Sequence, residues 1–271
     1  MNAEAIRVPS IISLLSDFGL KDPYVAEMKA VILSICPEAH IIDISHNIEK
    51  FNIRAGAFVL ASAMPYFPDG TIHLAVVDPG VGTKRRPIIV ETKHSFCVGP
   101  DNGLLMLGAQ KEGIQHVNHV SNQRYMFPKV SRTFHGRDVF APAAAYLVNG
   151  TPPSGFGPEI HDYMIPEFAK PHLTKGELCG EVLHVDDFGN IITNISKGGL
   201  DKVGIIEGFK LSIKLRGKAT RMKFCSTYGE APAKKPLALI GSHNFVEIAI
   251  NQGSASKRFK IKVGDAVIIC E

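Results

Sequence analysis

The spacing of apolar residues changes along the chain, and each part predicts a different kind of structure. In the first 150 residues, short apolar runs bounded by turn residues predict buried strands. Apolar residues that return every three or four positions predict helices with one buried face. The expected strands are 11–16, 39–45, 72–77, 88–94 and 95–98, and the expected helices are 25–35, 52–64, 103–112 and 138–148. Strands that alternate with helices of this length predict an α/β domain with a largely parallel central sheet.

Beyond residue 176, apolar and polar residues alternate with a period of two. The runs GEVLHVDDFGNIITNI and PLALIGSHNFVEIAI are examples, and turn residues separate such runs. This pattern predicts a smaller all-β domain, built as an antiparallel sandwich or barrel. The preceding segment is rich in proline and has little periodicity, which is typical of a linker. We therefore expect an α/β domain at 1–150, a Pro-rich linker at 151–176 and an antiparallel β-barrel at 177–271.

The composition excludes several classes of protein. With 45% hydrophobic and 21% charged residues in a chain of 271, a folded protein is expected rather than a disordered one. No apolar run approaches the length of a membrane span, and the N-terminus lacks the layout of a signal peptide. A cytoplasmic protein with no membrane partner is therefore expected. The five cysteines form no CxxC pair, so reduced thiols are expected rather than a disulfide framework or a zinc site.

Positive charge is concentrated in the second part of the chain. The net charge is +4, and residues 173–271 contain more basic than acidic residues. Within them, the stripe 210–223 alternates Lys or Arg with apolar residues, which most often indicates a solvated strand face. The stripe lacks the interleaved aromatic residues that stack on bases, so no nucleic-acid partner is expected.

Polar side chains lie at the carboxyl ends of three of the predicted strands. They are Asp17, the pair Asp43 and His46, and Asp78. Each acid alone is explained more simply as a helix cap or a turn residue. Because α/β sheets bind ligands at the carboxyl edge of their strands, the presence of all three there favours a site.

Two further stretches carry groups that suit chemistry. DPGVGTKRR begins at Asp78, but it lacks the spacing of a P-loop, and no GxGxxG follows the first strand. TFHGRD places His135 before a predicted helix, as a structural cap or as a base. An Asp, an Arg and a His brought together would hold and polarise a water molecule. Neither a nucleophile elbow nor an HExxH motif occurs in the sequence, so covalent catalysis and a metal site are not expected.

Seven motifs in this order resemble those of one enzyme family. They are SDFGLKDPYVAEMK, IIDISHNI, VVDPGVGTKRRPI, GPDNGLL, TFHGRD, DDFGNIITNI and IGSHNFVEIAINQGSA. The family is that of the adenosine-forming S-adenosylmethionine (SAM) hydrolases, also called SAM hydroxide adenosyltransferases, which are related to fluorinase and chlorinase. The resemblance implies an α/β domain joined to a C-terminal β-barrel. It also implies a homotrimer, with each site between the N-terminal domain of one subunit and the C-terminal domain of a neighbour.

The resemblance further implies which residues activate the water. By motif position they are Asp78, Arg85 and His135, and Arg85 is preferred to Arg86 because it lies seven residues after the acid. The halide-using relatives have Tyr in place of Asp78 and Tyr-Ser in place of His135-Gly136. A halide-using SAM adenosyltransferase is therefore the disfavoured alternative.

The remaining residues that the resemblance implies would bind the substrate. Asp17 would hold the ribose hydroxyls, Asp186 the methionine ammonium and Ser242 the methionine carboxylate. Phe188 and Tyr228 would pack on adenine, and Asn190 would hydrogen-bond to it. His243 stands where the halide-using relatives carry an arginine.

The implied reaction needs little assistance from the protein. Water attacks the ribose C5′ of SAM, whose sulfur is a positively charged sulfonium. Methionine therefore leaves as a neutral thioether, so neither a cofactor nor a metal is expected. A desolvated water and a proton acceptor are needed, and both Asp78 and His135 are candidates for the acceptor. The hypothesis from another class is a sensor that binds SAM or adenosine without turnover.

Overall fold

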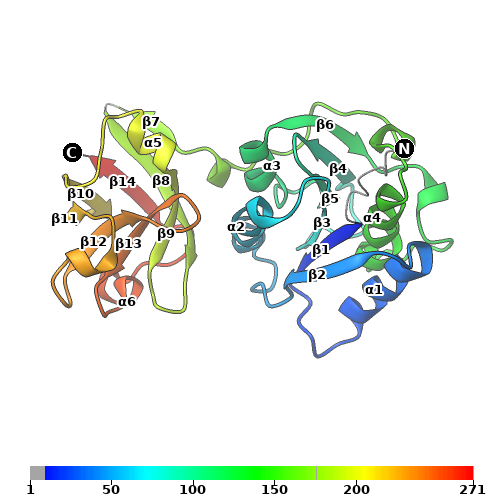
Figure 1. Ribbon diagram of the computed structural model, residues 1–271, viewed down its shortest axis with the longest axis horizontal. Helices are drawn as coiled ribbons and strands as arrows, with labels where there is room; N and C mark the ends of the chain where they lie inside the picture. The colour runs from blue at the N-terminus through cyan, green and yellow to red at the C-terminus, as the bar shows by residue number, and fades with distance from the viewer. Residues whose placement is uncertain (1–9, 175, 271) are drawn as a thin grey trace, which may run out of the picture. The chain divides into compact units, whose positions relative to one another are not determined.

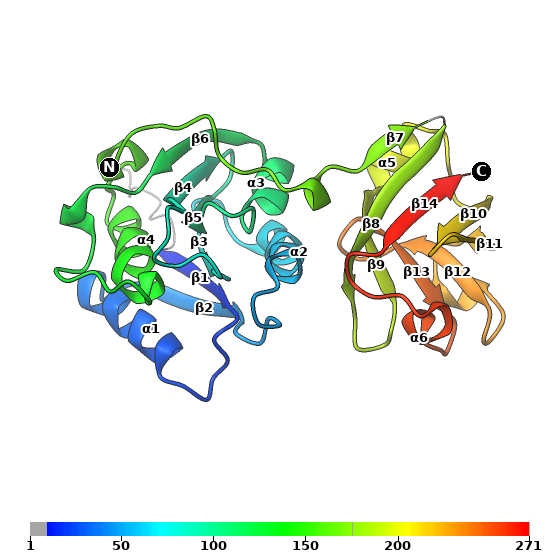
Figure 2. The same cartoon turned by 180° about the vertical axis from the view of Figure 1, so that it is seen from behind.

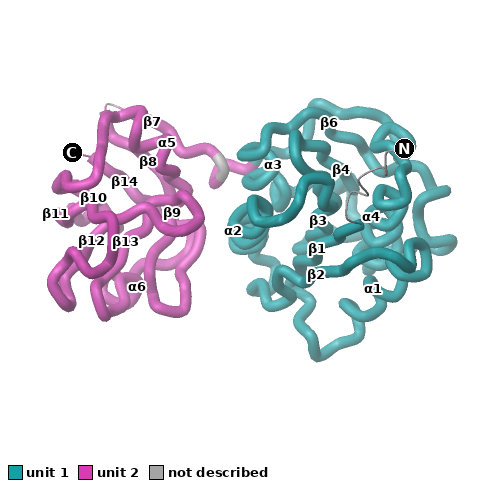
Figure 3. Tube along the Cα trace, viewed as in Figure 1, with its two compact units in different colours: residues 1–165 teal, residues 166–271 magenta. Residues whose placement is uncertain are grey.

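A computed structural model describes residues 10–174 and 176–270 of the chain. The chain divides into two compact units, residues 1–165 and residues 166–271 (Figure 3). Each unit has its own hydrophobic core, and each is described by itself.

The first unit contains a six-stranded sheet. Its strand order is β2 (His40–Ser45), β1 (Ile11–Ser16), β3 (Ile72–Val76), β5 (Phe96–Pro100), β4 (Pro87–Thr92) and β6 (Ile114–His119). The first four of these strands are parallel, whereas β4 pairs antiparallel with both β5 and β6. The predicted α/β domain with a largely parallel sheet is confirmed (Figure 1).

Helices cover both faces of this sheet. On one face lie α1 (Tyr24–Ile35) and α4 (Ala141–Val148), and on the other lie α2 (Ile53–Ala63) and α3 (Met106–Glu112), as Figures 1 and 2 show. Because side chains alternate along a strand, Leu74 and Val76 of β3 join the core beneath α1 and α4, while Ala75 joins the other core. None of the helices in the described part of the chain is long and apolar enough to cross a lipid bilayer.

Two local structures differ from the expected pattern. Strand β6 was not predicted, because its sequence IQHVNH is largely polar, as suits a strand at the edge of the sheet. The helix expected from residue 138 begins as a π-helical turn, η3 (Gly136–Phe140), which leads directly into α4. A π turn has one more residue per hydrogen-bonded ring than an α turn, so apolar spacing does not reveal it.

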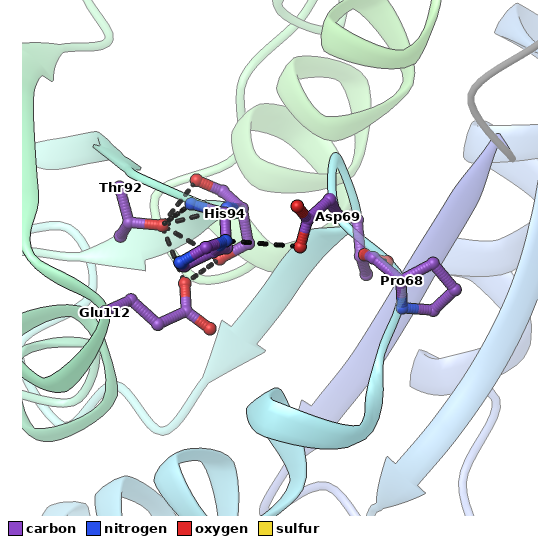
Figure 4. A network of polar contacts seen from close by, with 7 residues as sticks. Pro68, Asp69, Thr92, His94 and Glu112 are labelled. Atoms are coloured by element: carbon purple, nitrogen blue, oxygen red, sulfur yellow. Dashed lines mark hydrogen bonds and ion pairs between the residues drawn. The ribbon is translucent and has the colours of Figure 1, made fainter. Parts of the chain in front are cut away.

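A polar network lies at the edge of the sheet where β3 and β5 begin, and it connects the β4–β5 turn to α3 (Figure 4). The carboxylate of Glu112, the last residue of α3, accepts hydrogen bonds from Thr92 Oγ1 (2.7 Å) and Ser95 Oγ (2.5 Å). In the same region His94 Nδ1 lies 3.3 Å from a carboxylate oxygen of Asp69. These contacts hold the β4–β5 turn against α3 at the amino ends of the strands, and they leave the carboxyl ends to other loops.

The second unit is a closed seven-stranded barrel. Its strands are β8 (Glu177–Val185), β9 (Ile191–Ser196), β10 (Lys210–Leu215), β11 (Lys218–Phe224), β12 (Pro236–Ile240), β13 (Phe245–Ile250) and β14 (Ala266–Cys270). Pairing between β14 and β8 closes the ring, and β7 (His172–Thr174) adds to β8. The predicted β-barrel is confirmed. One of its neighbouring pairs, β11–β12, is parallel.

Short helical segments connect the strands and helices of both units. The α-helical ones in the barrel are α5 (Lys197–Asp201) and α6 (Ala255–Phe259). The 3₁₀ turns are η1 (Met64–Tyr66), η2 (Gln123–Tyr125), η4 (Pro153–Phe156), η5 (Glu167–Ala169) and η6 (Tyr228–Glu230).

Candidate active site

A pocket of about 400 Å³ opens at the carboxyl edge of the sheet, beside strands β1 and β3. The chain leaves β1 toward β2 on one side, and it later returns to β3 on the other side of β1. The carboxyl ends of β1 and β3 therefore flank a topological switch point, where α/β sheets bind ligands. The lining residues are Asp17, Phe18, Tyr24, Lys50, Phe51, Val76, Asp78, Val81, Thr133, Phe134, His135 and Gly136.

Asp78, Arg85 and His135 form one connected set of polar side chains. Arg85 binds the Asp78 carboxylate with two donors, from Nε to Oδ1 at 3.2 Å and from Nη2 to Oδ2 at 2.5 Å. The same Nη2 lies 3.1 Å from Nδ1 of His135. The side chains of Asp78 and Arg85 are only 5% and 7% exposed, so water screens this pair little. The structure thus brings together the three residues that the sequence motifs single out.

The contact with Arg85 defines the protonation state of His135. A guanidinium has donors only, so Nδ1 of His135 must accept the hydrogen bond, which leaves the proton of the neutral ring on Nε2. Burial and the neighbouring Arg85 cation lower the pKa of His135 from its ordinary value of 6.5, against the opposing effects of Asp78 and Asp138. His135 is therefore neutral at pH 7 and presents an N–H donor at Nε2.

Asp17 lies at the other side of the switch point. Its side chain is buried, and its Oδ2 accepts a hydrogen bond of 2.9 Å from the backbone N–H of Phe51. The backbone carbonyl of Asp17 accepts a hydrogen bond from Nζ of Lys50. The loop after β2 is thereby held against the end of β1. Two of its residues, Lys50 and Phe51, line the pocket beside Asp17.

The other polar residues at this edge have structural partners. His46 Nδ1 lies 2.7 Å from Oγ of Ser16, and its Nε2 lies 3.1 Å from a carboxylate oxygen of Asp43. These contacts connect the ends of β1 and β2, and neither His46 nor Asp43 lines the pocket. Arg86 pairs with Asp101 rather than with Asp78.

The five other residues implied by the motifs lie in the second unit, on turns of the barrel. Asp186 and Asn190 close the β8–β9 turn, where the Asp186 carboxylate accepts from the backbone and side-chain nitrogens of Asn190 at 2.8 and 2.9 Å. Phe188, at the tip of this turn, is 80% exposed. Tyr228 donates its hydroxyl hydrogen to Glu247 at 2.5 Å. Ser242 is exposed in the β12–β13 turn.

Comparison with known proteins assigns both units. The family model described as "SAM hydroxide adenosyltransferase N-terminal domain" matches residues 12–157, and that of the C-terminal domain matches residues 180–268. The chain belongs to the SAM hydroxide adenosyltransferase family.

Individual relatives match this family member along nearly its whole length. A protein of Methanocaldococcus jannaschii named (R)-S-adenosyl-L-methionine hydrolase is 41% identical, over 96% of this chain and 95% of its own. A protein of the same name from Thermus thermophilus is 39% identical, over 93% of this chain and 96% of its own. The crystal structure of an uncharacterized conserved protein from Thermotoga maritima has a TM-score of 0.87 at 38% identity, covering 96% of this chain and all of that one.

This SAM hydroxide adenosyltransferase family member has an aromatic pocket wall that the sequence pattern did not reveal. The rings of Phe18, Tyr24 and Phe134 contact one another, with centroids 5.2 to 5.7 Å apart. Phe51 is 69% exposed and has a left-handed backbone, with φ at +65°. Such a conformation is uncommon in a non-glycine residue, and Phe51 adopts it beside the pocket. Apolar periodicity could not identify these rings, because they lie in loops or at the first turn of a helix.

Replacing Gly82 with Ala is expected to reduce both activity and stability in this family member. Gly82 has φ at +74°, and a Cβ there would lie 2.3 Å from the carbonyl oxygen of Arg132, in the loop before His135. The strained backbone alone costs about 1–2 kcal/mol, and relief of the clash would move the two loops that carry Arg85 and His135 apart. The measurements are the thermal unfolding midpoint and kcat.

The matched control for this prediction is Gly80→Ala in the same loop. A Cβ at Gly80 would meet its nearest neighbours at 3.6 Å, an ordinary contact distance. This variant should therefore behave nearly as the unsubstituted protein does. If Gly82→Ala and Gly80→Ala have the same midpoint and the same kcat, the packing argument is wrong.

Proposed function

We propose that this protein hydrolyses S-adenosyl-L-methionine to adenosine and L-methionine. The observation that carries the proposal is the connected set of Asp78, Arg85 and His135 at the switch point of the sheet, in which the Asp78–Arg85 ion pair is buried. Family membership and the names of the relatives at 39% and 41% identity support the same reaction. The protein is accordingly an enzyme, and SAM is its substrate.

We propose a separate task for each of the three residues. We propose that Nε2–H of the neutral His135 donates a hydrogen bond to the attacking water, while a carboxylate oxygen of Asp78 accepts one of its protons. As the water oxygen bonds to C5′, the C5′–S bond breaks and its electron pair stays on sulfur. Methionine therefore leaves as a neutral thioether, and the proton passes from Asp78 to solvent. Arg85 holds Asp78 and His135 in place. Its two hydrogen bonds to Asp78 are already formed before the reaction, so the guanidinium does not need to reorient.

Asp78 suits the role of proton acceptor better than His135. The ring nitrogen of His135 that accepts hydrogen bonds is already occupied by Arg85. A carboxylate oxygen has more than one acceptor site, so Asp78 can bind Arg85 and still accept a proton from water. Since the leaving group needs neither an acid nor a Lewis acid, we propose that the reaction requires no cofactor or metal.

We propose that substrate binding uses residues of both units. Asp17 would hold the ribose hydroxyls, and five residues on turns of the barrel would hold adenine and methionine. These barrel residues are Asp186, Phe188, Asn190, Tyr228 and Ser242. We further propose a homotrimer, in which the α/β domain of one subunit and the barrel of a neighbour complete each site.

A turnover assay tests the proposed reaction. The protein, dialysed against a chelator, is incubated with SAM, and the products are separated by chromatography and identified by mass. Equal amounts of adenosine and methionine are expected. Tight binding of SAM without product would replace the proposal by a sensor function. A 5′-halogenated product in the presence of fluoride or chloride would replace it by halide transfer.

Complementation tests the shared site. The variants Asp78→Asn and Asp186→Asn should each have strongly reduced activity, because each lacks one half of every site. Co-expression of the two should restore part of the activity, because some sites then combine an intact α/β domain with an intact barrel. The mass in solution, measured by light scattering, should be that of three chains. A monomeric active enzyme would contradict the assembly but not the reaction.

Hydrolysis is expected to slow as the pH falls through the pKa of His135, which lies below 6.5. Above that pKa the ring is neutral and accepts from Arg85. Below it, both ring nitrogens are donors, so Nδ1–H faces the guanidinium and the contact breaks. The measurement is kcat between about pH 5 and pH 8, a range in which an unperturbed histidine titrates.

The control for this pH profile is His116→Gln. His116 is exposed on β6 and pairs with Glu159, which raises its pKa rather than lowering it. Its replacement should leave the profile unchanged. A midpoint of the acid limb above 6.5 would contradict the role given to His135.

A further inference from the structure

His135 is carried by an unusual piece of backbone. It directly precedes the π-helical turn η3, at the entrance to α4, and the loop 127–134 leads into it. π turns are rare; they occur mostly as single turns within helices, frequently at functional sites. The position of the His135 ring therefore depends on what holds this turn and the preceding loop together.

Asp138, inside the turn, has no exposed surface. It binds residues that come before and after His135 in the chain. Its Oδ2 accepts hydrogen bonds from the backbone N–H of Ser131 (2.7 Å) and from Nη2 of Arg137 (3.2 Å). Its Oδ1 accepts from Nε of Arg137 at 2.7 Å. The backbone of Asp138 adds two bonds, from its own N–H to Phe134 and from the N–H of Phe127 to its carbonyl. Asp138 thus closes the loop around His135.

Arg137 extends this arrangement to the pocket wall. Its Nη1 donates to a carboxylate oxygen of Glu27 on α1 at 2.9 Å. Its guanidinium lies 5.0 Å from the ring centroid of Phe134, which lines the pocket. The Arg137 side chain is 31% exposed, so Asp138 forms the buried end of the pair.

A buried ion pair of this kind contributes little to stability on balance, because desolvation offsets much of the attraction. Its position suggests another use. The charged groups near His135 are Arg85, Asp78, Asp17 and Lys50, which line or border the pocket, and Asp138 and Arg137 on its own turn. Arg85 lowers the pKa of His135, and Asp138 is, after Asp78, the second carboxylate that opposes this effect.

We propose that Asp138 is a positioning residue for the reaction, which acts by holding His135 in contact with Arg85. The inference rests on the proposed hydrolysis, in which His135 orients the attacking water. Asp138 touches neither the substrate nor the water in this scheme. Its effect passes through the backbone of the turn and through its charge.

The variant Asp138→Asn tests the proposal. Asparagine keeps the shape and one acceptor but removes the charge and weakens the hold on Ser131 and Arg137. We expect kcat to fall by about 10²-fold with little change in KM, because small misplacements of a catalytic group affect the transition state most. The pKa of His135, followed by NMR in the protein without substrate, should fall, because one opposing carboxylate is gone.

A second variant, Arg137→Gln, separates this role from a purely structural one. It removes the cation that neutralises Asp138, so the pKa of His135 should rise, in the opposite direction to that in Asp138→Asn. A loss of packing alone would not shift the two values in opposite directions. Because Arg137 is partly exposed, this variant remains informative if Asp138→Asn does not fold.

The control is Glu27→Gln, which removes the outer carboxylate from Arg137 and leaves the turn untouched. Its kcat should stay within twofold of the unsubstituted value, and the pKa of His135 should stay unchanged. An unshifted His135 pKa in Asp138→Asn, or an equal loss of kcat in Glu27→Gln, would overturn the inference. Absence of adenosine formation by the unsubstituted protein would instead refute the proposed hydrolysis, and the NMR titration would still test the link between Asp138 and His135.

Discussion

Replacing Asp78 with Asn is expected to lower kcat for SAM hydrolysis by about 10²- to 10⁴-fold, the range typical of removing a general base. Asparagine keeps an oxygen that can accept from Arg85, but it leaves that guanidinium, 7% exposed, without its counter-charge, so the variant should fold with reduced stability. It cannot take the proton of the attacking water. Binding of SAM, measured by calorimetry, should change little, because the lost interaction develops only in the transition state.

The matched control is Asp43→Asn, which changes another acid at the same edge of the sheet. Asp43 follows the pattern of Asp78 in the sequence, but its carboxylate pairs with Lys29 and does not line the pocket. Its replacement should leave kcat within a few-fold of the original value. Full turnover by Asp78→Asn would remove Asp78 from the mechanism, and His135 would have to be reconsidered as the proton acceptor.

Replacing Arg85 with Met is expected to destabilise the first unit by about 3–5 kcal/mol, in addition to abolishing activity. The change leaves the Asp78 carboxylate, 5% exposed, without its counter-charge. It also removes the donor to His135 and the contact of the guanidinium with the Phe140 ring, at 5.3 Å from the centroid. Chemical denaturation gives the free energy of unfolding.

A double variant distinguishes the lost pairing from the lost volume. Asp78→Asn combined with Arg85→Met removes both charges, so it should be more stable than Arg85→Met alone, although equally inactive. The control is Lys29→Met, which breaks a partly exposed pair with Asp43 and should cost no more than about 1 kcal/mol. Equal unfolding free energies for Arg85→Met and Lys29→Met would contradict the importance of burial.

The fold followed from the sequence where a residue's environment depends on its near neighbours. The apolar run at 72–77 predicted the buried strand β3 (Ile72–Val76), and the three- to four-residue spacing at 52–64 predicted α2 (Ile53–Ala63). Prediction failed where polar residues form an edge strand, as in β6, and where a helix begins with a wider turn, as at Gly136–Phe140. In both cases the structure depends on contacts with distant residues.

The candidate site was predictable in part for the same reason. Asp17 and Asp78 end neighbouring parallel strands, so their shared edge follows from the order of strands and helices. Asp43 and His46 satisfy the same rule, yet they bind Lys29 and Ser16 and stay outside the pocket. The direction in which a side chain points after a strand depends on loop packing, which the strand pattern does not determine.

By itself, the sequence determined the α/β and β-barrel architecture and the motifs around Asp78, Arg85 and His135. Only the tertiary structure decided that Arg85 holds the other two through one guanidinium, and that Asp138 fastens the turn that carries His135. Periodicity records which face of an element is buried, and hydrophobic burial tolerates shifts of an ångström. A hydrogen bond does not tolerate such shifts. Arg85 and His135 lie 50 residues apart in the chain, so their contact depends on how the two loops that carry them pack together.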